Sequence, residues 1–161
     1  MFGRQSLAQL QAEGMDTRHV KLTPGAASGV ALIPVDKKGE NTIIVASGAN
    51  ALLSAEDVRE AESEIAAASF VLMQLETPVE TLTFAAELAH KHHVKVVLNP
   101  APFPKNALPD ALLSIRTGSI RLISTTSTQQ PTMFRLLMST MARPITSGLL
   151  MLIHSMVLLL R

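Results

Sequence analysis

Apolar positions alternate between a helical period and short strand-like runs along the first two thirds of the chain. Residues 2–13 carry apolar side chains on one helical face, and Gly14 suits the position that follows a helix end. Residues 28–35 and 41–47 are apolar and rich in β-branched side chains, with a glycine-containing turn between them. This pattern predicts a short helix followed by a β-hairpin.

Two helix-start signals follow the hairpin. Ser54 and Asp57 have the spacing of a capping box, and apolar residues then recur at helical spacing. A mostly apolar run at 70–75 predicts a buried strand. Directly after it, Thr77 and Pro78 have the order of a helix cap and a first helical residue. We therefore expect a helix, a strand and a second helix in this order.

Residues 94–99 (VKVVLN) predict another buried strand, which closes a strand–helix–strand unit over residues 70–99. Strands joined by such a helix run parallel, and short apolar strands are typical of a sheet that is covered on both faces. The sequence therefore predicts the α/β fold class, with a βαβ unit at 70–99 and a small hairpin at 28–47.

Polar residues follow both strands of this unit. Glu76 comes after the first strand and Asn99 ends the second. In open α/β sheets, ligands bind outside the carboxyl ends of the strands. A carboxylate there accepts hydrogen bonds from hydroxyls, and a carboxamide both donates and accepts. Position alone leaves the other interpretations open, in which Glu76 is a solvated loop residue and Asn99 a turn residue before proline.

The net charge of +1 conceals an uneven distribution of charged residues. Residues 1–110 hold all 13 acids and 9 of the 14 Lys and Arg, a balance of −4 (9 − 13), whereas residues 111–161 hold five Arg and no acid. Such asymmetry can indicate a nucleic-acid-binding arm. These arginines are scattered among Leu, Met, Ser and Thr without an aromatic stacking platform, so we predict no nucleic-acid partner.

Length and composition narrow the class of protein further. A chain of 161 residues, 47% of them apolar, is long enough for one ordinary domain with a sizeable core. The absence of Cys excludes disulfides and thiolate metal sites. The first fifteen residues contain no apolar block of the kind a signal peptide needs, so we expect a cytoplasmic protein.

Two further segments invite a functional interpretation. His90, His92 and His93 suggest a metal site, but they also form the cationic last turn that a helix dipole favours. We prefer the second interpretation and predict no metal site. Residues 47–50 (SGAN) resemble part of a phosphate-binding loop, but a single glycine between small residues is too weak a signal to predict such a loop.

Five blocks of the chain stand out in this order: FGRQSLAQLQAEGMD, SGVALIPVDKKGEN, GANALLS, LMQLETP and VVLNPAP. In order and in spacing, these blocks resemble the middle of the ribokinase family of ATP-dependent sugar kinases. The resemblance covers about residues 2–113, and its most specific parts are LMQLETP and the LNPAP of the last block.

The resemblance implies a fragment of an α/β sandwich in which the hairpin at 28–47 belongs to a small β lid. In this family the lid covers the sugar and pairs two subunits, which implies a homodimer. Glu76 would contact a hydroxyl of D-ribose or a related pentose, and Asn99 would lie near the phosphate region. ATP and Mg would be the cofactors that the family requires.

Three motifs of the family are missing from the 161 residues. They are a Gly-Gly-Lys-Gly-x-Asn sugar-binding loop, an Asn-x-x-Glu motif that serves ATP and magnesium, and a Gly-Ala-Gly-Asp block. The Asp of that block takes the proton of the sugar hydroxyl, so we expect no catalytic residue in this chain. The resemblance therefore implies a truncated, inactive fragment of an enzyme that converts ATP and D-ribose to ADP and ribose 5-phosphate.

Two alternatives stay open at this point. One is a non-catalytic remnant that binds sugar or dimerises through the lid strands. The other is a small membrane-associated protein anchored by residues 146–160. That apolar run is shorter than the roughly 20 residues of a spanning helix and contains His154, so we predict no membrane partner.

Helix and strand signals stop agreeing after the first 113 residues, which we predict to form a partial domain. Residues 114–161 contain no Asp, Glu or Lys and are dominated by Ser, Thr, Leu, Met and Arg. We interpret 114–161 as an aberrant tail, translated in a wrong frame or disordered, because sequence selected to fold keeps its local signals consistent. A rival interpretation is an apolar partner-binding helix at 147–160.

We also expect the two strands of the βαβ unit to lack neighbours on their outer sides.

The wrong-frame interpretation is tested by translating the DNA beyond codon 113 in the two other frames. We expect one frame to encode Asn-x-x-Glu within about fifteen residues, and Gly-Ala-Gly-Asp further on. The reason is that a complete family member, selected to fold and function, carries both motifs after this point. If neither frame contains these motifs, the tail is not a frameshift product.

Overall fold

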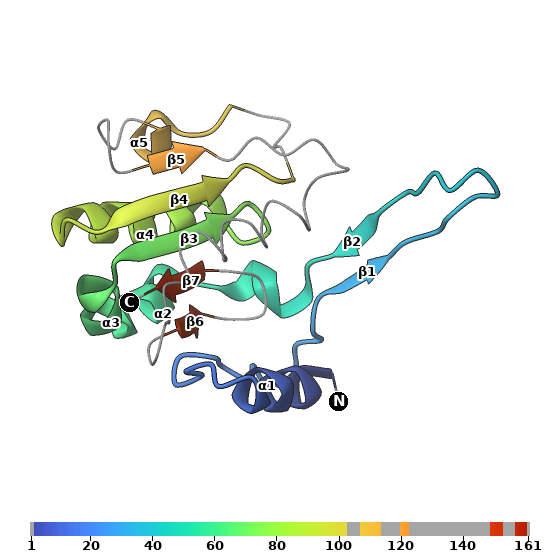
Figure 1. The fold of residues 1–161 in the computed structure, drawn as a ribbon, viewed down its shortest axis with the longest axis horizontal. Helices are drawn as coiled ribbons and strands as arrows, with labels where there is room; N and C mark the ends of the chain where they lie inside the picture. The colour runs from blue at the N-terminus through green and yellow to red at the C-terminus, as the bar shows by residue number, and fades with distance from the viewer. Residues whose placement is uncertain (1, 103–106, 114–119, 123–148, 153–156, 161) are drawn as a thin grey trace.

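The structure is a computed structural model and describes residues 2–102, 107–113, 120–122, 149–152 and 157–160. The described helices and strands form one five-stranded sheet with helices beside it, plus a separate hairpin (Figure 1). The elements are α1 (Phe2–Ala12), β1 (Val30–Leu32), β2 (Ile44–Ala46), η1 (Gly48–Leu52), α2 (Ala55–Glu60), α3 (Glu62–Ala67), β3 (Phe70–Gln74), α4 (Val79–Lys91), β4 (Lys95–Asn99), α5 (Asp110–Leu113), β5 (Ile120–Leu122), β6 (Leu149–Leu152) and β7 (Val157–Leu160).

The predicted βαβ unit is the centre of the sheet. Strands β3 and β4 run parallel, in a register that begins at Phe70↔Lys95 and ends at Gln74↔Asn99. Helix α4 connects them, and its buried residues lie on one side of the sheet, which confirms the α/β fold class.

The outer sides of β3 and β4 are both paired, contrary to our expectation. The strand order is β5-β4-β3-β7-β6, with β5 parallel to β4 and β7 antiparallel to β3. The rival interpretation of a helix at 147–160 is wrong, because residues 149–152 and 157–160 are strands. A continuous apolar run suits a strand as well as a helix, and here the unpaired edge of β3 supplies the hydrogen-bonding partner.

One apolar core lies between the sheet and helices α2, α3 and α4. Val71 and Met73 of β3 and Val96 and Leu98 of β4 face this core. Leu72 on the other face is also buried, in agreement with a sheet covered on both faces. The core consists of Val58, Ala61, Ile65, Ala68, Val71, Met73, Leu75, Leu82, Ala85, Ala86, Leu88, Ala89, Val94, Val96, Leu98 and Leu112.

The two predicted helix starts differ in outcome. The capping box before α2 is confirmed, since the Ser54 hydroxyl accepts from the Asp57 amide and the Asp57 carboxylate accepts from the Ser54 amide at 2.9 Å. The second start lies one residue later than predicted: Pro78 is the N-cap of α4, and Val79 is its first residue. Pro78 has an extended ψ of 132°, so it cannot be the first helical residue and Thr77 cannot cap the helix.

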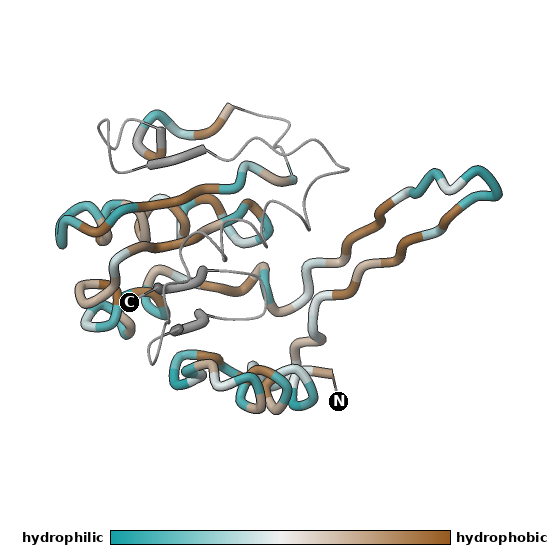
Figure 2. Tube along the Cα trace, in the orientation of Figure 1, coloured by the Kyte–Doolittle hydropathy of each residue, from teal (hydrophilic) through white to brown (hydrophobic). Residues whose placement is uncertain are grey.

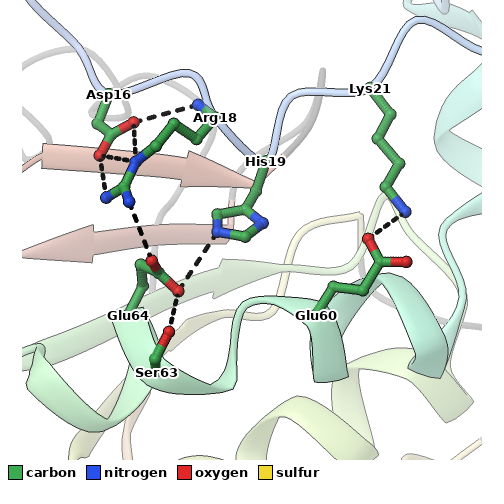
Figure 3. Close-up of polar contacts among 7 residues, drawn as sticks. All are labelled: Asp16, Arg18, His19, Lys21, Glu60, Ser63 and Glu64. Carbon is green, nitrogen blue, oxygen red and sulfur yellow. Dashed lines mark hydrogen bonds and ion pairs between the residues drawn. The ribbon is translucent and has the colours of Figure 1, made fainter.

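Charged side chains fix the segment after α1 to helices α2 and α3 (Figure 3). Arg18 and His19 both reach Glu64 of α3 at 3.3 Å. Lys21 lies 2.5 Å from Asp57 and 2.7 Å from Glu60 of α2. Ion pairs between partly buried groups contribute more to stability than fully exposed pairs do. This cluster of ion pairs therefore attaches the segment to α2 and α3.

The hairpin of β1 and β2 is confirmed, and it projects from the body of the molecule (Figure 1). Both of its strands are apolar and exposed (Figure 2), with Leu32 62% exposed. At its base, Gly48 has a φ of +55°, and a Cβ there would lie 2.5 Å from the Ala27 carbonyl oxygen. Close backbone contact therefore explains the glycine of residues 47–50 without a phosphate loop.

Asp57 should contribute to stability at neutral pH and lose that contribution in acid. Burial raises the pKa of Asp57, but hydrogen bonds from Lys21 and Ser54 outweigh burial, so the pKa is lowered overall. The contribution of a group with a lowered folded-state pKa is present above its unfolded pKa and is lost as the pH falls through the folded one. We expect Asp57→Asn to lower the free energy of unfolding by about 1 kcal/mol at pH 7, as the loss of a helix cap does. At pH 3 the decrease should be smaller.

Urea unfolding of both proteins at the two pH values measures this difference. The control is Glu87→Gln, an exposed carboxylate of α4, which should change the free energy of unfolding by less than about 0.5 kcal/mol. An equal cost of Asp57→Asn at pH 7 and pH 3 would contradict the role of its charge.

Candidate functional site

The carboxyl ends of β3 and β4 lie side by side. Gln74 and Asn99 are the last register pair of the two strands. Beyond them, the Leu75 amide donates to the Ala101 carbonyl at 3.1 Å, so the two segments stay together after the strands end. Glu76 follows in the turn before α4. The structure thus brings Glu76 and Asn99 to one edge of the sheet, while their roles stay predictions.

The alternation of side chains assigns Gln74 and Asn99 to one face of the sheet. Met73 and Leu98, which precede them, both point into the helix-covered core. Successive side chains of a strand point to opposite faces, so Gln74 and Asn99 lie on the face away from α4. Neighbouring strands are about 4.8 Å apart, which makes the two carboxamides adjacent.

Buried polar atoms without partners distinguish this edge. Gln74, Glu76 and Asn99 are partly buried, and Thr77 is only 7% exposed. Among the residues that the structure describes, no group hydrogen-bonds to the Asn99 Oδ1 or to the Thr77 Oγ1. Leaving a buried polar atom unsatisfied costs about 1–3 kcal/mol, so both atoms favour a water molecule or a ligand that supplies the missing bond.

These four residues, Gln74, Glu76, Thr77 and Asn99, are called the carboxyl-edge cluster below. Together they offer a carboxylate acceptor, two carboxamides that donate and accept, and a hydroxyl. Such a set is complementary to a ligand with several hydroxyl groups, since each hydroxyl both donates and accepts. It offers no strong positive charge for a phosphate.

Sequence reasoning missed Gln74 and Thr77. The signal for Gln74 was its position as the single polar residue in the apolar run FVLMQL. Thr77 was assigned to helix capping, because a Thr before Pro commonly has that role. Only the N-cap at Pro78 leaves the Thr77 hydroxyl without a helical partner.

Of the three histidines at the end of α4, His92 contacts an acidic residue of α3. His92 Nε2 lies 2.7 Å and Lys91 Nζ 2.8 Å from the same carboxylate oxygen of Glu62. Hydrogen bonds from Lys91 and His92 lower the pKa of Glu62. In the described ranges, no three His, Asp or Glu side chains gather where they could hold a metal ion.

The apolar run at the end of the chain was the basis for a possible membrane anchor. Its described parts are the strands β6 and β7. No helix in the described ranges combines the length and the apolar character that crossing a membrane requires.

Comparison with known proteins gives consistent matches. The model of the pfkB family carbohydrate kinase matches residues 1–117. The ribokinase of Haemophilus influenzae is 48% identical over 103 residues, which are 64% of this chain and 33% of that protein. The deoxyribokinase of Salmonella typhi is 36% identical over 102 residues, 63% of this chain and 33% of that protein.

Solved structures agree with the sequence relatives. The ribokinase of Giardia lamblia superposes with a TM-score of 0.65 at 29% identity, over 71% of this chain and 36% of that one. This chain spans about a third of the length of the curated relatives it matches. The family match nevertheless covers most of its residues, and the fold is that of the ribokinases. The chain belongs to the pfkB family of carbohydrate kinases.

Proposed function

We propose that residues 2–113 are the sugar-binding middle part of a ribokinase-type kinase. The reaction of the whole enzyme is the ATP-dependent phosphorylation of D-ribose to ribose 5-phosphate. The observation that carries this proposal is the carboxyl-edge cluster, with Glu76 directly after β3, in a segment 48% identical to a ribokinase. The 36% identity to a deoxyribokinase makes a related pentose the closest competing substrate.

Within this proposal, the residues of the chain bind and orient the sugar. The Glu76 carboxylate accepts a hydrogen bond from a sugar hydroxyl, and Asn99 lies toward the phosphate region. ATP, when bound, supplies the phosphoryl group, and the family motifs that serve ATP and magnesium are missing from the 161 residues. Phosphoryl transfer depends on positioning and on stabilisation of developing charge, so a sugar site alone does not catalyse it.

We expect no sugar kinase activity from residues 1–161 alone. The sequence contains neither a Gly-Ala-Gly-Asp block, which would supply the base and backbone amides, nor an Asn-x-x-Glu motif. Release of ADP in the presence of D-ribose and ATP is the measurement, with a sample lacking the protein as control. Ribose-dependent ADP release above that control would refute the expectation.

The role of Glu76 is tested in a complete kinase in which residues 2–113 replace the matching third of the Haemophilus influenzae ribokinase. A hydrogen bond to a charged group contributes about 1.5–3 kcal/mol, so Glu76→Gln should weaken ribose binding about tenfold or more. The KM for ATP should change less.

Glu80→Gln is the matched control, because Glu80 is an exposed carboxylate four residues further along the same segment. It should leave both constants unchanged. If Glu76→Gln raised the KM for ATP and left the KM for ribose unchanged, Glu76 would lie in the ATP site rather than in the sugar site.

A second proposed function is dimerisation through the hairpin, on the observation that both of its strands are apolar and exposed. A two-stranded hairpin is marginally stable in water by itself, so a covering partner would stabilise it. We expect a dimer in light scattering after gel filtration, and a monomer for the double variant Leu32→Lys/Ile44→Lys. These residues form a register pair, with 62% and 56% exposure.

Glu40→Lys, an exposed residue near the tip of the hairpin, controls for added positive charge and should leave the dimer intact. A monomeric wild-type chain, or a double variant that still dimerises, would rule out this interface.

A further inference from the structure

Gln74 is a polar side chain in a position where the sheet itself would favour an apolar one. Its predecessor on the same face, Leu72, is 3% exposed, and so is Val97 beside it on β4. Gln74 is partly buried next to them. Its carboxamide nitrogen and oxygen are not fully buried and have no hydrogen-bond partner among the described residues, so they are accessible to a bound molecule.

The protein itself forms no hydrogen bond to the Gln74 side chain within the described ranges. A hydrogen bond between Gln74 and Asn99 would be the simplest structural role, since the two residues form a register pair. No such bond is formed, and the Asn99 Oδ1 stays buried without a donor. The adjacent Thr77 Oγ1 is likewise without a partner among the described residues. Two neighbouring carboxamides that do not bind each other favour a third group between them.

We infer that Gln74 is a second sugar-binding residue. The Glu76 carboxylate accepts a hydrogen bond from one sugar hydroxyl, and the Gln74 carboxamide hydrogen-bonds the neighbouring hydroxyl. The inference rests on the proposed sugar site and adds a specificity-determining residue to it. Glu76 only accepts hydrogen bonds, whereas the Gln74 carboxamide donates and accepts, so the two suit adjacent hydroxyls of one ring. The ligand class is a polyhydroxylated pentose, and a sugar without that hydroxyl would leave the carboxamide unpaired.

The experiment uses the full 161-residue chain labelled with ¹⁵N and titrated with D-ribose. Nuclear magnetic resonance follows the side-chain NH₂ signals of Gln74, identified by their disappearance in Gln74→Met. We expect ribose to shift these signals directly. A neutral hydrogen bond contributes about 0.5–1.5 kcal/mol, so Gln74→Met should raise the Kd for ribose roughly fivefold.

Gln9→Met is the matched control, since Gln9 is an exposed residue of α1 outside the carboxyl-edge cluster. It should bind ribose as the wild type does. The wild-type side-chain signals test the contact without any substitution, so a poorly folded variant does not remove the test.

The possible results separate the two proposals. If ribose shifts backbone signals around Glu76 but neither shifts the Gln74 NH₂ signals nor binds Gln74→Met more weakly, the sugar site stands and the role of Gln74 is wrong. If ribose shifts no signal of the wild-type chain, the proposed sugar site of this chain is wrong, and the role of Gln74 with it.

Discussion

The parallel register of β3 and β4 is the constraint on which the rest of this structure depends. It sets Gln74 opposite Asn99, and it directs Val71, Met73, Val96 and Leu98 to the same core. A slip by one residue would exchange the faces of an entire strand and expose its core side chains. The burial of these apolar residues therefore also fixes which polar groups meet at the carboxyl edge.

The helical layer is fixed to this sheet by apolar packing and to the preceding segment by charge. Ile65 of α3 and Leu82 of α4 are fully buried in the core. Outside the core, Arg18, His19 and Lys21 bind acidic residues of α2 and α3. The Thr81 hydroxyl donates to the Leu53 carbonyl at 2.8 Å, so the chain leaving the hairpin is attached to the first turn of α4.

The hairpin of β1 and β2 differs from the body of the chain, because its strands are paired in a defined register but bury no apolar core. Its strands pair from Val30↔Ala46 to Leu32↔Ile44, and all of their residues are exposed. Apolar surface of this extent on both strands is characteristic of an interaction surface rather than of a free loop. The body of the chain thus buries its own apolar groups, whereas the apolar side chains of both hairpin strands are exposed.

Family membership and the carboxyl-edge cluster support the proposal that this chain binds a sugar without phosphorylating it. A sugar can be held by carboxylate, carboxamide and hydroxyl groups of a single βαβ unit. Phosphoryl transfer needs a base, amide donors and a nucleotide site arranged around the same sugar, and these come from other parts of a kinase. A chain that spans about a third of its relatives can therefore retain the first function without the second.

Elements whose signals are local were predictable from the sequence. The hairpin, the capping box of Ser54 and Asp57, and the two buried strands follow from periodicity and cap chemistry within a few residues. The parallel connection then placed Glu76 and Asn99 at one edge, and the resemblance of LMQLETP and LNPAP to a sugar kinase family led to the proposal that a sugar binds there.

Features that depend on distant partners were decided only by the tertiary structure. The shift of the N-cap to Pro78, the division of one predicted helix into α2 and α3, and the pairing of β7 with β3 belong to this group. So does the significance of Gln74, a single polar residue in an apolar run. Its neighbour Asn99 is 25 residues away along the chain and adjacent across the sheet, and local periodicity contains no information about that register.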